Sequence, residues 1–324
     1  MDKDILKRLK NAGLLSEELP ELGFVGTGSY AINKVISGDF TKGIPIGMIT
    51  CFHGEASSGK TIFATHILKE AQSKNYHAVM IDSENAYSLD FAAHLGIDPE
   101  ALLYAKPETI EEAFETIEEV VLAIRETDED TPIVVVYDSI AVSPTKDEYA
   151  ASGYEQHNMR GAQRAKATGG CLRKINPMMR KEKVALVIIN QLRSKVGSYI
   201  PQDVMAAGGR SLEYYLGVNL KSISGTEKKY QIYNERKQPI GIRGKIRNTK
   251  NKVAIPFKEC EFELRYDEGL NPYAGVLELL KADGHVEVNG GWHTVVETGK
   301  KFRGDDFMKL LPTPEFTSIR EMLQ

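Results

Sequence analysis

The sequence of 324 residues has little that would mark a secreted or membrane protein. Its three cysteines, Cys51, Cys171 and Cys260, are odd in number, far apart and without a C-x-x-C pair. We therefore expect buried thiols in a reducing compartment rather than disulfides. No apolar run approaches the roughly 18 residues that a membrane-spanning helix requires. The chain opens with Met1-Asp2-Lys3-Asp4 and continues with charged amphipathic sequence, which predicts no secretory signal and a cytoplasmic location.

Zinc-binding patterns and a strong excess of one charge are also missing. The seven histidines include no H-x-x-x-H pair, so no structural zinc is expected. A net charge of −4 gives no general sign of nucleic-acid binding, and any such surface must be local. The 42% of apolar residues are enough for a proper core, and the length allows one large domain with small appendages.

One short stretch, HGEASSGKTIF from His53 to Phe63, places glycines, serines, a lysine and a threonine between two apolar runs. A strand is expected at 48–52 and a helix from about Lys60. A glycine-rich loop between a strand and a helix is the setting in which G-x-x-x-x-G-K-[ST] binds phosphate, because its backbone N–H groups and the helix N-terminus attract anions. The predicted nucleotide-binding residues are Gly54, Glu55, Ala56, Ser57, Ser58, Gly59, Lys60 and Thr61. Lys60 is expected to contact the β- and γ-phosphates, and the Thr61 hydroxyl to bind Mg²⁺.

The rest of the chain alternates strands and helices from Ile46 onward, which predicts a doubly wound α/β core. A helix is expected at 110–124, with its many glutamates on a solvated face. After Gly217 the pattern changes to hairpin-like strands, followed by a small mixed tail at 276–324. The expected strands are 78–81, 133–137, 184–189, 217–224, 240–248 and 260–266.

Three polar residues follow strands of this core, where ligands bind in open α/β sheets. Asp138 is predicted to hold Mg²⁺, although a turn-forming aspartate is the alternative. Glu84 is predicted to position the attacking water, or else to be an acid at a helix N-terminus. Gln191 is predicted to contact the γ-phosphate or its water, or else to be a buried structural amide.

Two regions carry local positive charge. The loop after Gln191 contains Arg193 and Lys195 and ends in Gly208-Gly209-Arg210. Residues 158–183 hold eight basic side chains against the single acid Glu182, a local net charge of +7. This stretch is either a solvated helix face or, beside a second cationic loop, a surface that follows a phosphate backbone.

Seven motifs, in this order, resemble those of the RecA-type recombinases: GEASSGKT, IDSEN, VVVYDS, IINQLRSKVG, AAGGRSLEYY, KNKVAIPFK and EGLNPYAG. The resemblance runs from about Gly26 to about Trp292. The length, the short amino-terminal helix and the abbreviated tail are most similar to the phage-encoded UvsX-like branch, which would place the protein in the host cytoplasm.

The resemblance implies a RecA-like P-loop ATPase core with a mostly parallel sheet. It divides the chain into a protomer-docking helix and linker (1–24), the core (25–270) and a small C-terminal α/β subdomain (271–324). Two DNA-binding loops are expected at about 144–166 and 192–209.

Residue roles follow from the same resemblance. Glu84 matches the catalytic glutamate, Asp138 the Walker B carboxylate, and Gln191 the residue that couples ATP to the second DNA loop. Phe91 matches the aromatic that stacks on adenine. Lys250 and Lys252 match the pair that reaches the ATP of a neighbouring protomer, while Glu213 stands where bacterial relatives carry lysine. The implied DNA-binding residues are Met159, Arg164, Arg173, Arg193, Lys195, Val196, Gly208, Gly209 and Arg210.

The function implied is an ATP- and Mg²⁺-dependent recombinase, active in recombination, repair and recombination-dependent replication. It would form helical filaments on single-stranded DNA, pair that strand with homologous duplex and work with a single-strand-binding protein and a loading mediator. Two alternatives stay open at this point: a ring helicase with the same core, and an assembling ATPase regulator that does not bind DNA.

Overall fold

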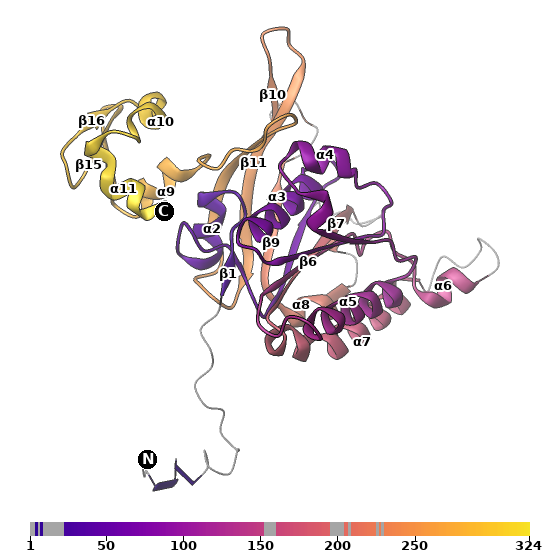
Figure 1. The fold of residues 1–324 in the computed structure, drawn as a ribbon. Coiled ribbons are helices and arrows are strands. Elements are labelled where there is room, and N and C mark those ends of the chain that lie inside the picture. The colour runs from indigo at the N-terminus through magenta and orange to yellow at the C-terminus, as the bar shows by residue number, and fades with distance from the viewer. Residues whose placement is uncertain are drawn as a thin grey trace.

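The computed structural model describes residues 4, 5, 7, 8, 23–151, 160–194, 204–206, 209–224, 227 and 230–324. Its centre is an 11-stranded sheet in the order β13-β12-β11-β9-β3-β7-β6-β4-β5, with β10 paired to β11 and β8 to β7 (Figure 1). The parallel part comprises β3 (Ile49–Gly54), β4 (His77–Asp82), β5 (Leu102–Ala105), β6 (Ile133–Asp138), β7 (Val184–Ser194) and β9 (Leu216–Ile223).

The sheet continues as an antiparallel ribbon beyond β9. The strands of this ribbon are β10 (Gln231–Tyr233), β11 (Pro239–Asn251), β12 (Glu259–Arg265) and β13 (Gly269–Leu270). The short strand β8 (Val204–Ala206) pairs antiparallel with the end of β7. A small separate pair, β1 (Phe24–Val25) and β2 (Ile44–Pro45), lies at the start of the core.

Helices cover both faces of the parallel strands, and the strands are therefore apolar on both sides. On β6, Val134 and Val136 face one cluster of buried residues, while Ile133, Val135 and Tyr137 face the other. The first face is covered by α3 (Lys60–Ser73), and α2 (Tyr30–Ser37) extends this layer over the antiparallel strands β11 and β12. The second face is covered by α5 (Ile110–Arg125), α7 (Arg160–Lys181) and α8 (Gly209–Tyr215) (Figure 1). The connections hold α4 (Leu89–His94), η1 (Pro99–Ala101) and α6 (Lys146–Ala150).

The C-terminal segment, yellow in Figure 1, forms a small α/β unit beside α2. Its three-stranded sheet packs on aromatic rings, with the centroids of Phe302 and Phe316 5.1 Å apart. An ion pair of 3.0 Å joins Lys34 of α2 to Asp283. The elements of this unit are α9 (Val276–Ala282), β14 (Val286–Asn289), β15 (Trp292–Val295), β16 (Lys301–Phe302), η3 (Gly304–Asp306), α10 (Phe307–Leu310), η4 (Pro314–Phe316) and α11 (Thr317–Met322).

The α/β class and the mostly parallel sheet are confirmed, and so are the strands and helices expected on either side of the glycine-rich loop. The predicted strand at 184–189 is too short, because β7 continues to Ser194 and pairs there with β8. The division at residues 24 and 270 stays a prediction.

Two further sequence expectations concern the burial of the cysteines and membrane-spanning helices. Cys51 and Cys260 are buried as predicted, whereas Cys171 is partly exposed on α7. Among the described residues, no helix is both long and apolar enough to span a membrane.

Candidate active site

The loop between β3 and α3 has the backbone conformation that its glycines allow. Gly59 caps α3 with a φ of 80°, and Ser57 has a φ of 58°. Gly54, at the end of β3, has no room for a side chain, since an added Cβ would lie 2.7 Å from the Ser58 hydroxyl. Gly59 offers no side chain to cap the helix, so the N–H groups of the first turn of α3 are directed at the loop. This arrangement favours an anion in the loop.

Lys60 is held inside this loop. Its side chain is 7% exposed, and its ammonium donates to the Glu55 carbonyl at 2.6 Å and to the Ser58 hydroxyl at 3.4 Å. Burial lowers the pKa of Lys60, while Asp138, Glu84 and Glu55 act in the opposite direction. The cation is therefore already in the loop that would receive a phosphate, and a phosphate oxygen could replace either neutral acceptor.

Thr61 and Asp138 meet between α3 and β6. The Thr61 hydroxyl donates to Asp138 Oδ2 at 2.6 Å. Burial raises the pKa of Asp138 to about 6, opposed by the Thr61 hydrogen bond and assisted by the negative charge of Glu84. Oxygen ligands of this kind suit Mg²⁺, and the Thr61 oxygen keeps lone pairs for a cation while it donates its hydrogen to Asp138. The two residues thus fit a Mg²⁺ ion.

Glu84 and Gln191 lie beside this pair. Glu84 Oε1 accepts from the Ser139 hydroxyl at 2.7 Å and from the Gln191 amide at 3.1 Å. Glu84 follows β4, and Gln191 lies within β7 where it passes the edge of the sheet. Two residues far apart in sequence are thus joined by one carboxylate oxygen, which makes Gln191 a partner of Glu84 rather than a buried structural amide.

A cavity of about 560 Å³ gathers these groups. Ala56–Ile62, Glu84, Asp138 and Gln191 line it. The antiparallel ribbon supplies the other wall with Ile242, Leu264 and Tyr266, which the sequence analysis missed. Ile242 and Leu264 are paired across β11 and β12 and are buried like any core residues, so their sequence pattern carries no signal of a site.

Five residues predicted for the nucleotide site do not line this cavity: Gly54 and Glu55 at the start of the loop, and Phe91, Lys250 and Lys252 elsewhere. Phe91, on α4, is 39% exposed and does not line the cavity. Lys250 lies eight residues beyond Ile242 on β11, roughly 26 Å away along the strand at about 3.3 Å per residue. Its ammonium donates to the Glu213 carbonyl, and burial together with Lys252 lowers its pKa. Lys250 and the adjoining Lys252 therefore cannot serve the cavity of their own chain.

The predicted DNA contacts are only partly visible. Met159, Lys195, Val196 and Gly208 lie outside the described residues. Arg193 falls in β7, and Gly209 and Arg210 open α8. Arg173 is exposed on α7. Arg164 is engaged elsewhere, since its Nε donates to Glu148 at 2.9 Å.

The basic stretch 158–183 is less positive in the fold than in the sequence. Lys174 on α7 forms an ion pair of 2.5 Å with Glu118 on the neighbouring helix α5. Glu115 of α5 likewise pairs with Lys146 at 2.8 Å. The glutamates of α5 are thus not simply a solvated face, because part of their charge offsets that of α7 and of the chain leading to it.

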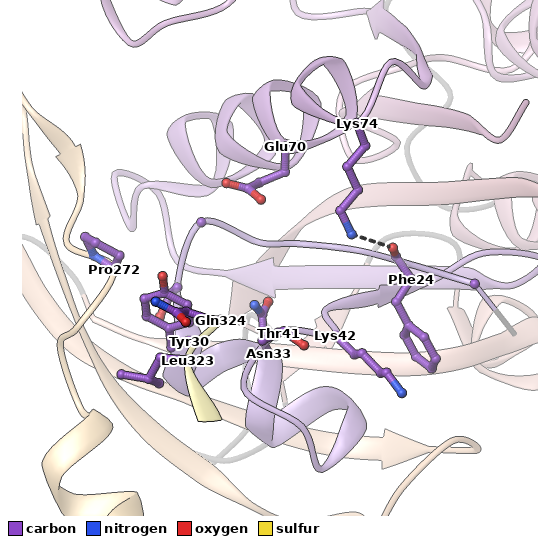
Figure 2. A pocket seen from close by; sticks show the side chains of 13 residues that line it. Phe24, Tyr30, Asn33, Thr41, Lys42, Glu70, Lys74, Pro272, Leu323 and Gln324 are labelled. Carbon is purple, nitrogen blue, oxygen red and sulfur yellow. Dashed lines mark hydrogen bonds between the residues drawn. The ribbon is translucent and has the colours of Figure 1, made fainter. Parts of the chain in front are cut away.

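A second cavity, of about 540 Å³, lies between α2, α3 and the C-terminal unit (Figure 2). Glu70 of α3 and Lys74, which follows that helix, line it on one side, while Tyr30 and Asn33 line it from α2. Lys74 is committed to the Phe24 carbonyl at 3.2 Å. None of the predicted site residues that the structure describes lines this cavity, and its distinct walls separate it from the nucleotide site.

Comparison with known proteins agrees with this geometry. Residues 10–271 match the family model described as the RecA N-terminal domain. Protein RecA of Geobacter sulfurreducens is 33% identical over 276 residues, covering 85% of this chain and 77% of the relative. The chain belongs to the RecA family. Protein RecA of Citrifermentans bemidjiense is 32% identical over 323 residues, covering 99% of this chain and 89% of that relative.

As a RecA-family protein, the chain is an ATP-dependent DNA recombinase with DNA-dependent ATPase and strand-exchange activity. Membership of this family implies nucleotide binding, single-stranded DNA binding and filament formation. The ring helicase and the DNA-independent regulator are not favoured. Membership of the phage UvsX-like branch stays a prediction.

Asp138 gives a test of the electrostatics without nucleotide. Because its pKa is raised to about 6 in the folded state, its contribution to stability is complete below about pH 4 and is lost as the pH rises through 6. Asp138→Asn should therefore stabilise the nucleotide-free, EDTA-treated protein at pH 8 by up to about 3 kcal/mol and much less at pH 4.5. Urea unfolding at the two pH values measures this. A variant less stable than wild type at pH 8 would contradict the assignment.

Proposed function

We propose that this RecA-family chain binds the triphosphate of ATP in the Ala56–Ile62 loop and hydrolyses it with Glu84 as the residue that orients the attacking water. The supporting observation is that four side chains from three separate parts of the chain, Lys60, Thr61, Glu84 and Asp138, meet at one cavity. Lys60 would neutralise charge on the β- and γ-phosphates, and backbone N–H groups of the loop and of α3 would hold their oxygens.

Thr61 and Asp138 would hold Mg²⁺. When bound, the ion neutralises charge that develops on the phosphate oxygens. Hydrogen bonds within the chain would orient the groups around the ion and the phosphates. Asp138 accepts from the Thr61 hydroxyl, and Ser139 and Gln191 donate to the Glu84 carboxylate at the cavity. Phe91, near the same edge of the sheet on α4, is proposed to stack on adenine.

Lys250 and Lys252 are proposed to complete the site of a neighbouring protomer in the filament. Both lysines, Lys250 on β11 and Lys252 just beyond it, lie too far away to reach the cavity of their own chain, which supports action on the cavity of a neighbour. Positive charge supplied in this way would stabilise the transition state only in the assembled polymer. ATP would then lie in the seam between two subunits, and the segment 1–24 would dock each protomer on the next.

Gln191 is proposed to couple the state of the bound nucleotide to the conformation of the second DNA-binding loop. Strand β7 runs from the sheet through Gln191 to Ser194, so a change at the phosphate is passed directly to the loop 192–209. We assign DNA contacts to that loop, to 144–166 and to two residues outside these loops, Arg173 of α7 and Arg210 of α8. The loop residues assigned are Met159, Arg164, Arg193, Lys195, Val196, Gly208 and Gly209. Arg164 would have to exchange its Glu148 partner for a phosphate.

A single-strand-binding protein and a loading mediator are proposed as partners, and the cytoplasm is the proposed location.

The assignment as a whole is tested by ATP turnover with and without single-stranded DNA, together with negative-stain microscopy. We expect DNA to stimulate turnover and ATP to produce helical filaments. Lys60→Ala should abolish turnover and weaken ATP binding, because the charge facing the phosphates is lost. Lys69→Ala, which removes a lysine from the same helix outside the cavity, is the control and should turn over ATP as wild type does. Turnover indifferent to DNA, or full activity in Lys60→Ala, would refute the proposal.

Glu84→Gln tests the water-orienting role. The amide keeps the size of the side chain but cannot accept a proton or a second strong hydrogen bond, so hydrolysis should slow at least about 100-fold. ATP-dependent DNA binding should persist, since Glu84 is not expected to hold the phosphates. Single-turnover hydrolysis and fluorescence anisotropy with labelled DNA separate the two effects. Loss of nucleotide affinity in this variant would instead indicate a structural acid.

The seam between protomers is tested by mixing two inactive proteins, Lys60→Ala and the double variant Lys250→Ala, Lys252→Ala. In a random equimolar filament, about a quarter of the seams would combine an intact loop with intact lysines, because head-to-tail contacts pair different surfaces. DNA-stimulated turnover should therefore reappear on mixing. If the mixture stays as inactive as its components, or if the double variant alone is fully active, the lysines do not act in trans.

A further inference from the structure

The loop that carries Glu84 is built around one buried carboxylate, that of Asp82. This residue ends β4 and is 1% exposed. Its Oδ1 accepts the Glu84 backbone N–H at 3.0 Å. Its Oδ2 accepts the Tyr87 backbone N–H at 3.0 Å and the Tyr104 hydroxyl at 2.8 Å. The position of Glu84 thus depends on how Asp82 is held, because the two residues are joined through the backbone itself.

Tyr104 is the side-chain donor to Asp82 among the described residues. It lies on β5, opposite Met80 of the neighbouring strand β4, and its hydroxyl reaches the end of that strand. Burial and the Asp82 carboxylate raise the pKa of Tyr104, so its proton stays on the hydroxyl throughout the neutral range. A buried carboxylate requires donors, and a charged acceptor strengthens each hydrogen bond that it receives.

The same tyrosine also contacts the other side of the loop. The rings of Tyr104 and Tyr87 lie with centroids 6.1 Å apart. The Tyr87 hydroxyl lies 3.2 Å from the hydroxyl of Thr65 on α3, the helix that begins with Lys60 and Thr61. The stretch from Asp82 to Tyr87 is therefore fixed at one end to β5 and at the other to the helix of the phosphate-binding loop.

We propose that Tyr104 is a positioning residue for ATP hydrolysis, which acts through Asp82 to hold Glu84 at the cavity. This inference rests on the proposed role of Glu84. Without the hydroxyl, Asp82 keeps only its two backbone donors, and the turn around it loosens. The Glu84 carboxylate then spends less time in the geometry set by Ser139 and Gln191. Phosphate and Mg²⁺ contacts involve other residues, so nucleotide affinity is unaffected.

Tyr104→Phe is the decisive variant, because it keeps the ring and removes only the hydroxyl. We expect kcat for ATP hydrolysis at saturating single-stranded DNA to fall about tenfold, with the KM for ATP and ATP-dependent DNA binding unchanged. Tyr76→Phe is the control: Tyr76 is also partly buried, but its hydroxyl has no hydrogen bond among the described residues, so its kcat should match wild type. A rise in KM at constant kcat, or a wild-type kcat in Tyr104→Phe, would overturn the proposal.

A double-mutant cycle with Glu84→Gln separates positioning from a general structural effect. If Tyr104 acts through Glu84, Tyr104→Phe should change the rate of Glu84→Gln by less than twofold. Independent effects that multiply would overturn the inference. Full hydrolysis by Glu84→Gln alone would refute the role of Glu84 instead, so the two failures are distinguishable. If urea unfolding shows that Tyr104→Phe is poorly folded, Asp82→Asn takes its place and must give the same loss in kcat and the same non-additivity.

Discussion

The hydrogen bond from Thr61 to Asp138 is the contact on which the site depends. It joins the first turn of α3 to the last residue of β6, and so fixes the phosphate-binding loop against the edge of the parallel sheet. Right-handed crossovers between parallel strands bring the ends of β3, β4, β6 and β7 to this same edge. Lys60, Glu84 and Gln191 are near one another because each lies near the carboxyl end of one of these strands, at the same edge of the sheet.

The core and most of its site were predictable because local rules and topology agree. The glycine-rich loop specifies its own conformation, and continuous apolar runs such as 133–137 specify strands buried on both faces. Residues at the carboxyl end of such a strand or just beyond it, Asp138 and Glu84, could then be placed at one edge. The cavity wall made by Ile242, Leu264 and Tyr266 could not be predicted from the sequence. These residues reach the cavity through the pairing of β11 with β12, and their local sequence resembles that of ordinary strand residues.

Charge was harder to interpret from sequence than hydrophobicity. Summing residues 158–183 gives a strongly positive stretch, yet Lys174 and Arg164 are bound by glutamates from other segments. Whether a cation faces nucleic acid depends on what the fold places opposite it, and ion pairs at the surface are weak enough to be exchanged for phosphate. The contact between Tyr104 and Asp82 also depends on the fold, because no pattern in the sequence around Tyr104 predicts it.

Strand β11, 13 residues long, links two places that matter to different subunits. At Ile242 it forms part of the wall of the cavity in its own chain, and at Lys250 it carries one of the two lysines proposed to act on a neighbouring protomer. Strand β11 is paired with β12 over Gly241–Arg247 and with β9 over Lys245–Asn251, so the sheet holds it along the whole length between these two places. If the lysines act as proposed, one strand of each subunit would contact its own nucleotide near one end and that of a neighbour near the other. Successive sites along a filament would then be connected in a single direction.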